Sequence, residues 1–190
     1  MTILDNDFLA EFKRATEAQW SRKSLDPSLY GFQFQRGTRC NPGLPNEKIA
    51  EYEHTLGVRF PHDFRALLIA MNGTDLPTLN VYGSRGHTPP HQSVGVYAYP
   101  RDVDVVKQRI EDLRGHRAQA AAALAEQGFD LIPEAQPVPI YIHRYVVCTP
   151  DLDSSVVLSV HGADAIVYGY SLREYLGREF LGARGRPQRA

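Results

Sequence analysis

The chain has 190 residues, of which 43% are hydrophobic, and this combination suits one domain with a substantial buried core. Its 21 Lys and Arg residues nearly balance its 22 Asp and Glu residues, which gives a formal net charge of -1. This balance excludes a global electrostatic attraction to nucleic acid or to an anionic membrane, so we expect neither as a direct partner.

Two features of the sequence indicate a reducing cytoplasm. Cys40 and Cys148 are too few for a disulfide framework, and they do not form a C-x-x-C pair. Asp5, Asp7 and Glu11 interrupt the N-terminal stretch where a signal peptide needs an apolar run. Because no segment reaches the ~20 apolar residues that span a bilayer, we expect a cytoplasmic protein.

The N-terminal part of the chain predicts a helix followed by a short strand. Apolar side chains recur at helical spacing from Leu4 towards Trp20, and Asp5 stands where an N-cap is expected. Residues 32–35 alternate phenylalanine with glutamine, a pattern typical of a half-buried strand. Residues 41–45 contain two prolines and a glycine, which break the regular structure.

The stretch from Pro45 to Gly73 predicts two helices joined by a three-residue link. Gly57 can adopt the left-handed conformation that commonly follows the last turn of a helix. Pro61 suits the first position of the second helix, where its missing N–H costs nothing, and Gly73 is expected to end that helix. The predicted buried stripe of the second helix consists of Phe64, Leu67, Leu68 and Met71.

Glu53 breaks the pattern of the first helix of this pair. It shares a helix face with the apolar residues Ile49, Tyr52 and Leu56. A carboxylate placed there needs hydrogen-bond donors, because its desolvation is otherwise costly. Our hypothesis is that Glu53 reaches across the link and caps the free N–H groups at residues 62–64, at the start of the next helix.

The second half of the chain predicts mainly strands, with one long helix before them and one short helix after them. Ser171 and Glu174 have the spacing of a capping box at the start of the last helix. The expected elements are strands at 79–83 and 93–99, a helix at 102–129 that Gly115 bends or splits and Gly128 ends, a connector at 132–139, strands at 140–149, 155–161 and 165–170, and a helix at 171–181.

Short links between the late strands favour antiparallel pairing, so the predicted fold class is α+β. We expect one domain over residues 1–181. The remaining residues, 182–190, read as a basic flexible tail, since chain termini are usually poorly ordered.

From Trp20 to Phe180, the order of these features resembles the SMI1/KNR4 family of the SUKH superfamily. In the first half, the resemblance lies in an apolar helix with an internal glutamate, an "LG" pair, an apolar residue before proline, and an "NG" pair. In the second half, "VLSV", a turn and "IVYGYSLREYLGREF" are similar to the late strands and last helix of the family. The residues assigned to this structural pattern are Trp20, Glu53, Gly57, Pro61, Asn72, Gly73, Ser171 and Glu174.

The resemblance implies a single SMI1/KNR4-like domain, mainly an antiparallel sheet flanked by helices, with no cofactor and no catalysis. Two features depart from the family pattern. Phe60 stands where leucine is common, which keeps an apolar anchor, and residues 109–128 form a long insert. The signature consists of core and capping positions, which specify a fold rather than a function.

What the family does supplies the functional expectation. Bacterial members are widely found as immunity proteins of polymorphic toxin systems, which bind the effector domain of a toxin, often a nuclease or deaminase, and block it. We therefore expect an antitoxin-like immunity protein, a monomer or weak homodimer, whose partner is a cognate toxin domain. The alternative is a regulatory or scaffold interaction module of the same family without a toxin partner.

Two surface patches are candidates for binding this partner. One is the polar loop with Arg85, His87 and His91, because exposed loops on rigid scaffolds commonly carry recognition. The other is acidic, since carboxylates that face the phosphate-binding arginines of a nuclease would steer association. The acidic candidates are Asp102, Asp104, Glu111 and Asp112 on the long helix and Asp151 and Asp153 in a later loop.

Catalytic and metal sites receive less support from the sequence. His87 and His91 are four residues apart, and His116 or His143 could complete a set, but two prolines between the pair rule out a helical arrangement. We therefore expect no metal. A Cys148–His143 hydrolase is a distant alternative, because residues five apart on one strand lie on opposite faces and a free cysteine is commonly buried.

Overall fold

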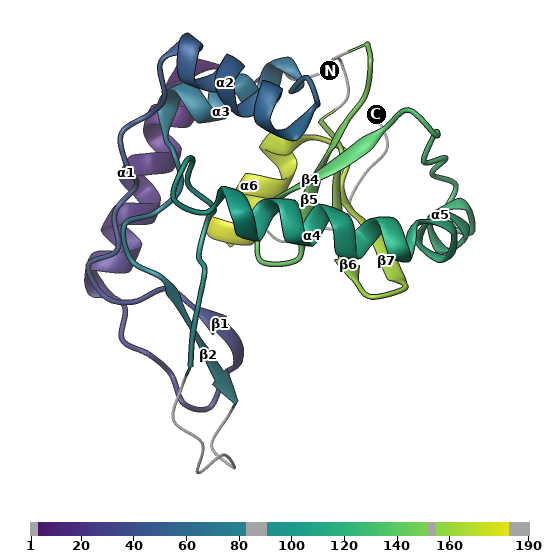
Figure 1. The fold of residues 1–190 in the computed structure, drawn as a ribbon. Coiled ribbons are helices and arrows are strands. Elements are labelled where there is room, and N and C mark those ends of the chain that lie inside the picture. The colour runs from purple at the N-terminus through teal and green to yellow at the C-terminus, as the bar shows by residue number, and fades with distance from the viewer. Residues whose placement is uncertain (1–3, 83–90, 152–154, 183–190) are drawn as a thin grey trace.

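The computed structural model describes residues 4–82, 91–151 and 155–182. Its described part has six helices and two antiparallel sheets, so the predicted α+β class is confirmed (Figure 1). The helices are α1 (Asn6–Arg22), α2 (Asn46–Leu56), α3 (His62–Ala70), α4 (Val103–Gly115), α5 (Arg117–Ala125) and α6 (Leu172–Phe180). The strands are β1 (Tyr30–Gln33), β2 (Thr78–Tyr82), β3 (His91–Ser93), β4 (Gln136–Tyr141), β5 (Arg144–Cys148), β6 (Val157–His161) and β7 (Asp164–Gly169).

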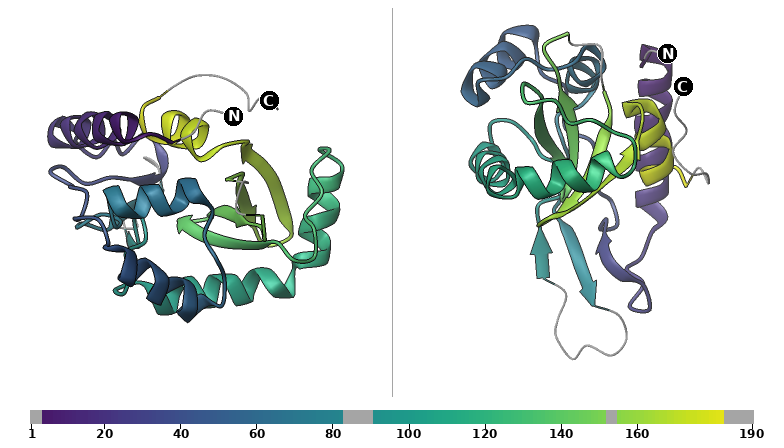
Figure 2. Two further views of the ribbon diagram at one scale, coloured as in Figure 1. Left: turned by 90° about the horizontal axis from the view of Figure 1, so that it is seen from above. Right: turned by 90° about the vertical axis from the view of Figure 1, so that its right-hand side faces the viewer.

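The four-stranded sheet, in the order β4-β5-β6-β7, has helices on both faces (Figure 2). Helices α4 and α5 run along one face, α4 against β4 and α5 against β7. Helix α6 packs on β7 from the other side, and α1 lies against α6 and α3. The three-stranded sheet, β1-β2-β3, extends away from this body as an arm, as Figure 1 shows below the sheet.

Alternate side chains of β5 divide the interior into two buried clusters. Val146 and Cys148 point into the larger cluster, which includes side chains of α1, α3 and α6. Tyr145 and Val147 point into the smaller cluster with side chains of α5. This division follows from the period-two geometry of a strand, and it explains why the late strands are apolar on both faces.

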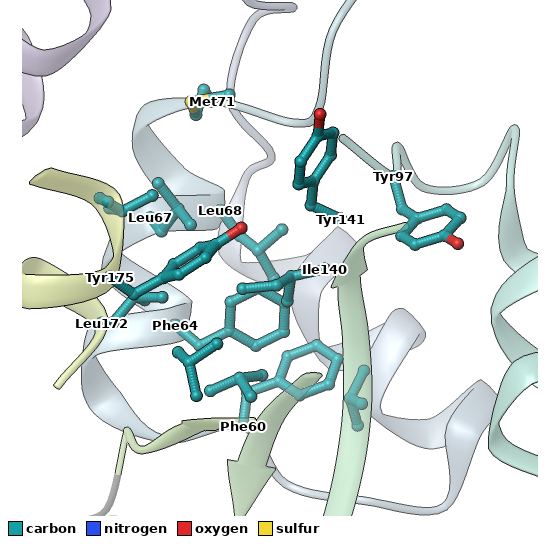
Figure 3. Close-up of a cluster of buried hydrophobic side chains, with 14 of the residues drawn as sticks. Phe60, Phe64, Leu67, Leu68, Met71, Tyr97, Ile140, Tyr141, Leu172 and Tyr175 are labelled. Carbon is teal, nitrogen blue, oxygen red and sulfur yellow. The ribbon is translucent and has the colours of Figure 1, made fainter. Parts of the chain in front are cut away.

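Helix α3 supplies the centre of the larger cluster. Figure 3 shows Phe64 and Leu67 beside Leu172 and Tyr175 of α6, with Ile140 of β4 completing the contact. The burial predicted for Phe64, Leu67, Leu68 and Met71 is confirmed, although Met71 follows the last residue of α3 and is not part of the helix.

The buried carboxylate of Asp63, in the first turn of α3, joins three distant parts of the chain. It accepts hydrogen bonds from the Leu4 N–H at 3.1 Å and from the Ser155 hydroxyl at 3.0 Å. The Ser155 oxygen in turn accepts from the Leu172 N–H at the start of α6, at 3.3 Å. The segment before α1, the approach to β6 and the N-terminus of α6 are thereby fixed to α3.

The link between α2 and α3 confirms one prediction and corrects two. Gly57 ends α2 in the left-handed conformation, with φ of 65°, as predicted. Pro61 occupies the N-cap position rather than the first helical position. Helix α3 ends at Ala70, three residues before the predicted stop at Gly73. The helix cannot continue to Gly73 because the backbone of Met71 is extended.

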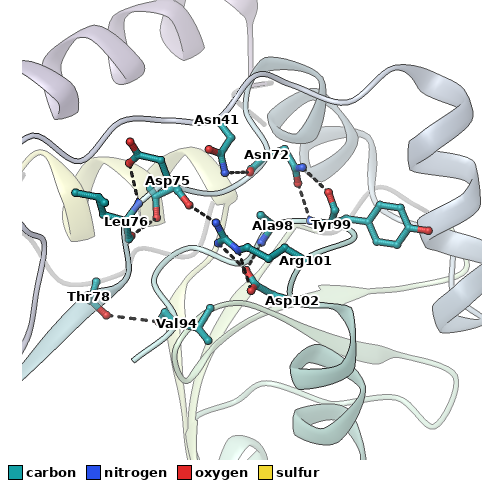
Figure 4. A network of polar contacts seen from close by, with 11 residues as sticks. Asn41, Asn72, Asp75, Leu76, Thr78, Val94, Ala98, Tyr99, Arg101 and Asp102 are labelled. Carbon is teal, nitrogen blue, oxygen red and sulfur yellow. Dashed lines mark hydrogen bonds and ion pairs between the residues drawn. The ribbon is translucent and has the colours of Figure 1, made fainter. Parts of the chain in front are cut away.

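Asn72 and Gly73 hold the end of α3 against the segment that leads to α4 (Figure 4). The Asn72 side chain donates to the Tyr99 carbonyl at 2.6 Å and accepts from the Tyr99 N–H at 2.9 Å. Its own carbonyl accepts from the Asn41 amide at 3.0 Å. Gly73 has φ of 70°, and a Cβ there would lie 2.6 Å from the Val96 carbonyl oxygen.

The Glu53 hypothesis is correct about the reach of the side chain but wrong about the donors. Its carboxylate accepts from the Phe60 N–H at 2.7 Å and from the Arg65 guanidinium at 2.6 Å. Phe60 precedes α3, and Arg65 lies one residue beyond the predicted 62–64 amides. Glu53 therefore fixes the link and pairs with α3 from the side, where both charged groups are largely shielded from solvent.

Replacement of Glu53 by alanine should lower the melting temperature by several degrees. The change leaves the Phe60 N–H and the Arg65 guanidinium without their acceptor, and such a loss costs about 1–3 kcal/mol. Thermal unfolding followed by circular dichroism measures the shift, with Glu47→Ala at an exposed position of α2 as the matched control. An unchanged midpoint in the Glu53 variant would rule out this role.

Two predicted strands of the first half are misplaced. The strand expected at 32–35 is β1, Tyr30–Gln33, because the Gln33 side chain turns inward and bonds the carbonyls of Asp26 and Leu29. The strand expected at 93–99 ends at Ser93. Beyond it, Val96 forms only an isolated bridge with Tyr141.

The later elements contain a larger error. The stretch expected to be a connector at 132–139 followed by one strand at 140–149 is a β-hairpin, in which β4 and β5 meet at Ile142 and His143. Pro137 and Pro139 are tolerated in β4 because it is an edge strand, where a missing N–H breaks no ladder.

The helix expected at 102–129 is split where Gly115 suggested, and α5 ends at Ala125, before Gly128. The capping box is confirmed with one change. The Ser171 hydroxyl accepts a hydrogen bond from the Glu174 N–H at 3.1 Å, as expected. The Glu174 carboxylate accepts from the Tyr170 N–H at 2.8 Å, one residue before the cap rather than at the cap itself. Of the predicted tail, residues 183–190 lie outside the described residues. None of the helices in the described ranges combines the length and apolar character needed to span a bilayer.

Candidate functional site

A cavity of about 470 Å³ opens beside α4, between that helix and the turns of the two late hairpins. We call it the histidine groove and define it by its polar lining residues, Arg109, Asp112, His116, His143, Tyr145 and His161. Phe32, Leu113 and Val160 add apolar wall. The three histidines come from different parts of the chain: the α4–α5 junction, the β4–β5 turn and the end of β6.

The β4–β5 turn places His143 on the groove through a strained backbone. Ile142 has φ of 50°, in the left-handed region that a β-branched residue rarely adopts. Its carbonyl accepts a hydrogen bond from the buried Tyr97 hydroxyl at 3.0 Å. Tyr97 belongs to the segment that leads to α4, so this bond fixes the turn to that segment. Such strain persists only where surrounding contacts impose it, and it concentrates at functional sites.

Arg109 supplies the positive charge of the groove. Burial raises the pKa of the Tyr97 hydroxyl, and the adjacent Arg109 guanidinium partly opposes this rise. Burial likewise raises the pKa of Tyr145 to about 12, and the positive charge of Arg109 again partly opposes the rise. Arg109 and Tyr145 both line the cavity, so this positive charge belongs to the groove.

His143 is held neutral at ordinary pH. Burial lowers its pKa to about 4, and the positive charges of Arg144 and Arg109 act in the same direction. The His161 ring lies edge-on to it, with 6.4 Å between ring centroids. A neutral imidazole presents one N–H donor and one acceptor, so His143 can contribute a hydrogen bond but no charge.

We expect the His143 imidazole to titrate near pH 4 instead of near 6.5, which NMR measures directly. The unfolded chain takes up this proton near pH 6.5, whereas the folded chain does so only near pH 4. Stability should therefore fall as pH drops from 6.5 to 4 and level off below that range. His143→Gln should remove this part of the pH dependence of the urea midpoint. A His143 titration midpoint near 6.5 would contradict the burial described above.

The predicted acidic face of α4 carries charges of both signs. Asp104 and Glu111 are exposed and line a second cavity, of about 390 Å³, together with Lys107 and Arg114. Glu111 forms an ion pair with Arg114 at 3.0 Å. The structure thus brings these two predicted partner-binding residues together, but on a surface of mixed charge.

Asp102 does not belong to the predicted surface patch, and this assignment is corrected. Its side chain is only 7% exposed, and its carboxylate accepts from the Ala98 N–H at 2.8 Å. Figure 4 shows the Arg101 guanidinium against the same carboxylate, with a second bond from Arg101 to the Thr74 carbonyl at 2.9 Å. Asp102 therefore stabilises the turn before α4 and is not available to a partner.

Asp112 lines the histidine groove, and the remaining predicted binding residues lie away from it or outside the described part of the chain. Arg85, His87 and Asp153 lie outside the described residues. His91 pairs with Asn80 on the arm. Asp151 is exposed after β5 and accepts a hydrogen bond from the Thr149 hydroxyl.

The residues weighed as metal ligands or nucleophile are dispersed. Within residues 4–82, 91–151 and 155–182, no group of three His, Cys, Asp or Glu side chains could hold a metal ion. Cys148 is 2% exposed, and burial raises the pKa of its thiol. His143 lies in a turn on the groove, not on one strand with Cys148 as predicted, while the thiol belongs to the larger buried cluster.

The Cys148 thiol should resist alkylation in the folded protein. A raised pKa leaves almost no thiolate, and thiolate is the reactive form. Cys40, with a pKa raised to about 12 mainly by burial, should react slowly as well. Mass spectrometry after iodoacetamide treatment at pH 8 should find no label on Cys148 until urea unfolds the protein. Rapid native labelling of Cys148 would contradict this assignment.

Comparison of the chain with protein-family models, with curated proteins and with solved structures found no match. The SMI1/KNR4 resemblance therefore rests on the order and spacing of residues in the sequence.

Proposed function

We propose that the protein is an immunity protein that binds a toxin domain through the face carrying the histidine groove. The observation that carries this proposal is the convergence of Arg109, His116, His143 and His161 on one open cavity. They come from three separate parts of the chain and offer charge and hydrogen bonds to an incoming group. Such a concave surface with a few polar groups between apolar walls is suited to recognition.

The position of the thiol supports binding over catalysis. A cysteine hydrolase needs a thiolate within hydrogen-bond reach of its base. Here Cys148 is buried in the core with a raised pKa, and His143 faces the groove with a lowered one. Both shifts favour neutral groups, the opposite of a thiolate–imidazolium pair.

The resemblance supplies the class of partner. Its matching positions are used inside the fold: Trp20 is buried, Glu53 fixes the α2–α3 link, and Ser171 caps α6. Residues that build the scaffold leave the groove face free to differ between relatives, as partner-specific recognition requires. We place the protein in the cytoplasm, where an intracellular toxin domain would act.

Co-expression tests this proposal. The protein should restore growth to cells that express the toxin domain encoded beside its gene, and it should co-purify with that domain. Arg109→Ala in the groove should abolish rescue. Arg14→Ala, a matched change on the exposed face of α1, should retain it. Co-purification without rescue would instead favour the regulatory or scaffold module, and absence of both would contradict a toxin partner.

A further inference from the structure

We propose that the histidine groove receives a carboxylate side chain of the protein partner, seated against the Arg109 guanidinium. This inference rests on the proposed function for the existence of a protein partner and specifies the chemistry of the group that enters. It assigns the partner an aspartate or glutamate at the centre of its contact surface.

Arg109 lines the groove, and no carboxylate in the described part of the chain forms an ion pair with it. Two other arginines nearby do have a carboxylate partner among the described residues. Arg144 forms an ion pair with Glu179, and Arg114 forms one with Glu111. Arg109 has no ion pair with a described carboxylate, although Asp112 stands three residues later on the same helix. Asp112 instead accepts from the Gln108 amide at 2.8 Å.

The surroundings of Arg109 favour a carboxylate over a neutral group. Its charge acts on the hydroxyls of Tyr97 and Tyr145 and on the neutral imidazole of His143, and none of these groups carries a negative charge. The Asp112 carboxylate lines the same groove but bonds the Gln108 amide and forms no ion pair with Arg109. A guanidinium presents a planar fork of donors that matches the two oxygens of a carboxylate. His161, beside His143, adds a further donor on the same wall.

The groove is also preformed. The Tyr97 hydroxyl fixes the Ile142 carbonyl, so the β4–β5 turn and His143 are already in place before a partner arrives. Apolar side chains such as Leu113 and Val160 line the same cavity and lower the local dielectric, which strengthens an ion pair formed inside it. Little ordering is then needed on binding, and this reduces its entropic cost.

A peptide titration tests the inference with the purified protein alone. The probes are an acetylated and amidated tetraglutamate peptide, its tetraglutamine counterpart and inorganic phosphate. We expect the glutamate peptide to cause saturable shifts of the His143 and His161 imidazole NMR signals, and the glutamine peptide to cause none. The Arg109→Gln variant should bind the glutamate peptide with an affinity lower by about tenfold or more, because it lacks one charge-assisted contact.

Arg114→Gln is the matched control, because it removes the same charge from the same helix but outside the histidine groove. It should leave the titration unchanged. Equal binding of both peptides, or undiminished binding by Arg109→Gln, would overturn the inference. Stronger binding of phosphate than of the glutamate peptide would overturn the assignment of a carboxylate. Because no toxin enters this experiment, failure of co-expression rescue with an intact peptide response would refute only the proposed function.

Discussion

Replacement of Gly43 by alanine is expected to destabilise the protein by at least about 3 kcal/mol, the upper end of the usual cost of overpacking. A Cβ at this position would lie 1.7 Å from the Ile69 carbonyl oxygen and 2.4 Å from its carbonyl carbon. The obstacle is backbone of α3, which cannot rotate away as a side chain can. The Leu44 N–H also bonds the Leu68 carbonyl at 2.8 Å, so the two segments cannot separate without breaking that contact.

Urea unfolding followed by far-ultraviolet circular dichroism measures this effect. Gly115→Ala is the matched control, because a Cβ at the end of α4 meets no atom within 4 Å. Alanine there should be neutral or stabilising by up to about 1 kcal/mol. Similar urea midpoints for the two variants would show that the chain before α2 does not pack on α3 as described.

Trp20→Ala should remove about 3–5 kcal/mol of stability, the usual cost of truncating a large buried aromatic residue. The indole is 2% exposed and stacks on Phe34 with 4.5 Å between ring centroids. It also contacts the Phe180 ring edge-on at 6.5 Å. Because this one side chain joins α1, the segment that follows β1 and α6, its loss should loosen all three.

Circular dichroism is the measurement of choice here, since Trp20 is the only tryptophan of the chain and its removal abolishes indole fluorescence. Leu29→Ala provides a control at an apolar side chain that is 57% exposed. That change should stay within about 0.5 kcal/mol of the wild type. A Trp20 variant as stable as the Leu29 variant would contradict the packing of α1 on the core.

The helices were predictable from the sequence because their signals are local. The apolar stripe of α3, the left-handed glycine after α2 and the cap of α6 each depend on residues within a few positions of one another. The β4–β5 hairpin was missed for a related reason. Pro137 and Pro139 argue against a strand unless that strand lies at an edge, and edge position is a property of the whole sheet.

The candidate site was less predictable than the fold. Sequence reasoning considered His116 only as a metal ligand and His143 as a metal ligand or as the partner of Cys148 in a hydrolase, and it did not consider Arg109 or His161. No spacing connects these residues, since a hairpin turn and a helix junction bring them together only in the folded chain. Asp102 is an error of the opposite kind, because a residue predicted to bind a partner is used inside the fold. A carboxylate at the start of a helix is expected to be exposed, but the Ala98 N–H and the Arg101 guanidinium bond this one and bury it.

Calorimetric titration of the cognate toxin domain with groove variants tests the central claim, that the histidine groove is the binding face. Arg109→Glu reverses the charge that an incoming carboxylate would meet, and disrupting such a contact costs enough to weaken binding by about a hundredfold. Arg114→Glu makes the same change on the same helix outside the groove. The proposal predicts that Arg109→Glu loses this affinity while Arg114→Glu stays near the wild type; equal affinities for Arg109→Glu and the wild type would contradict it.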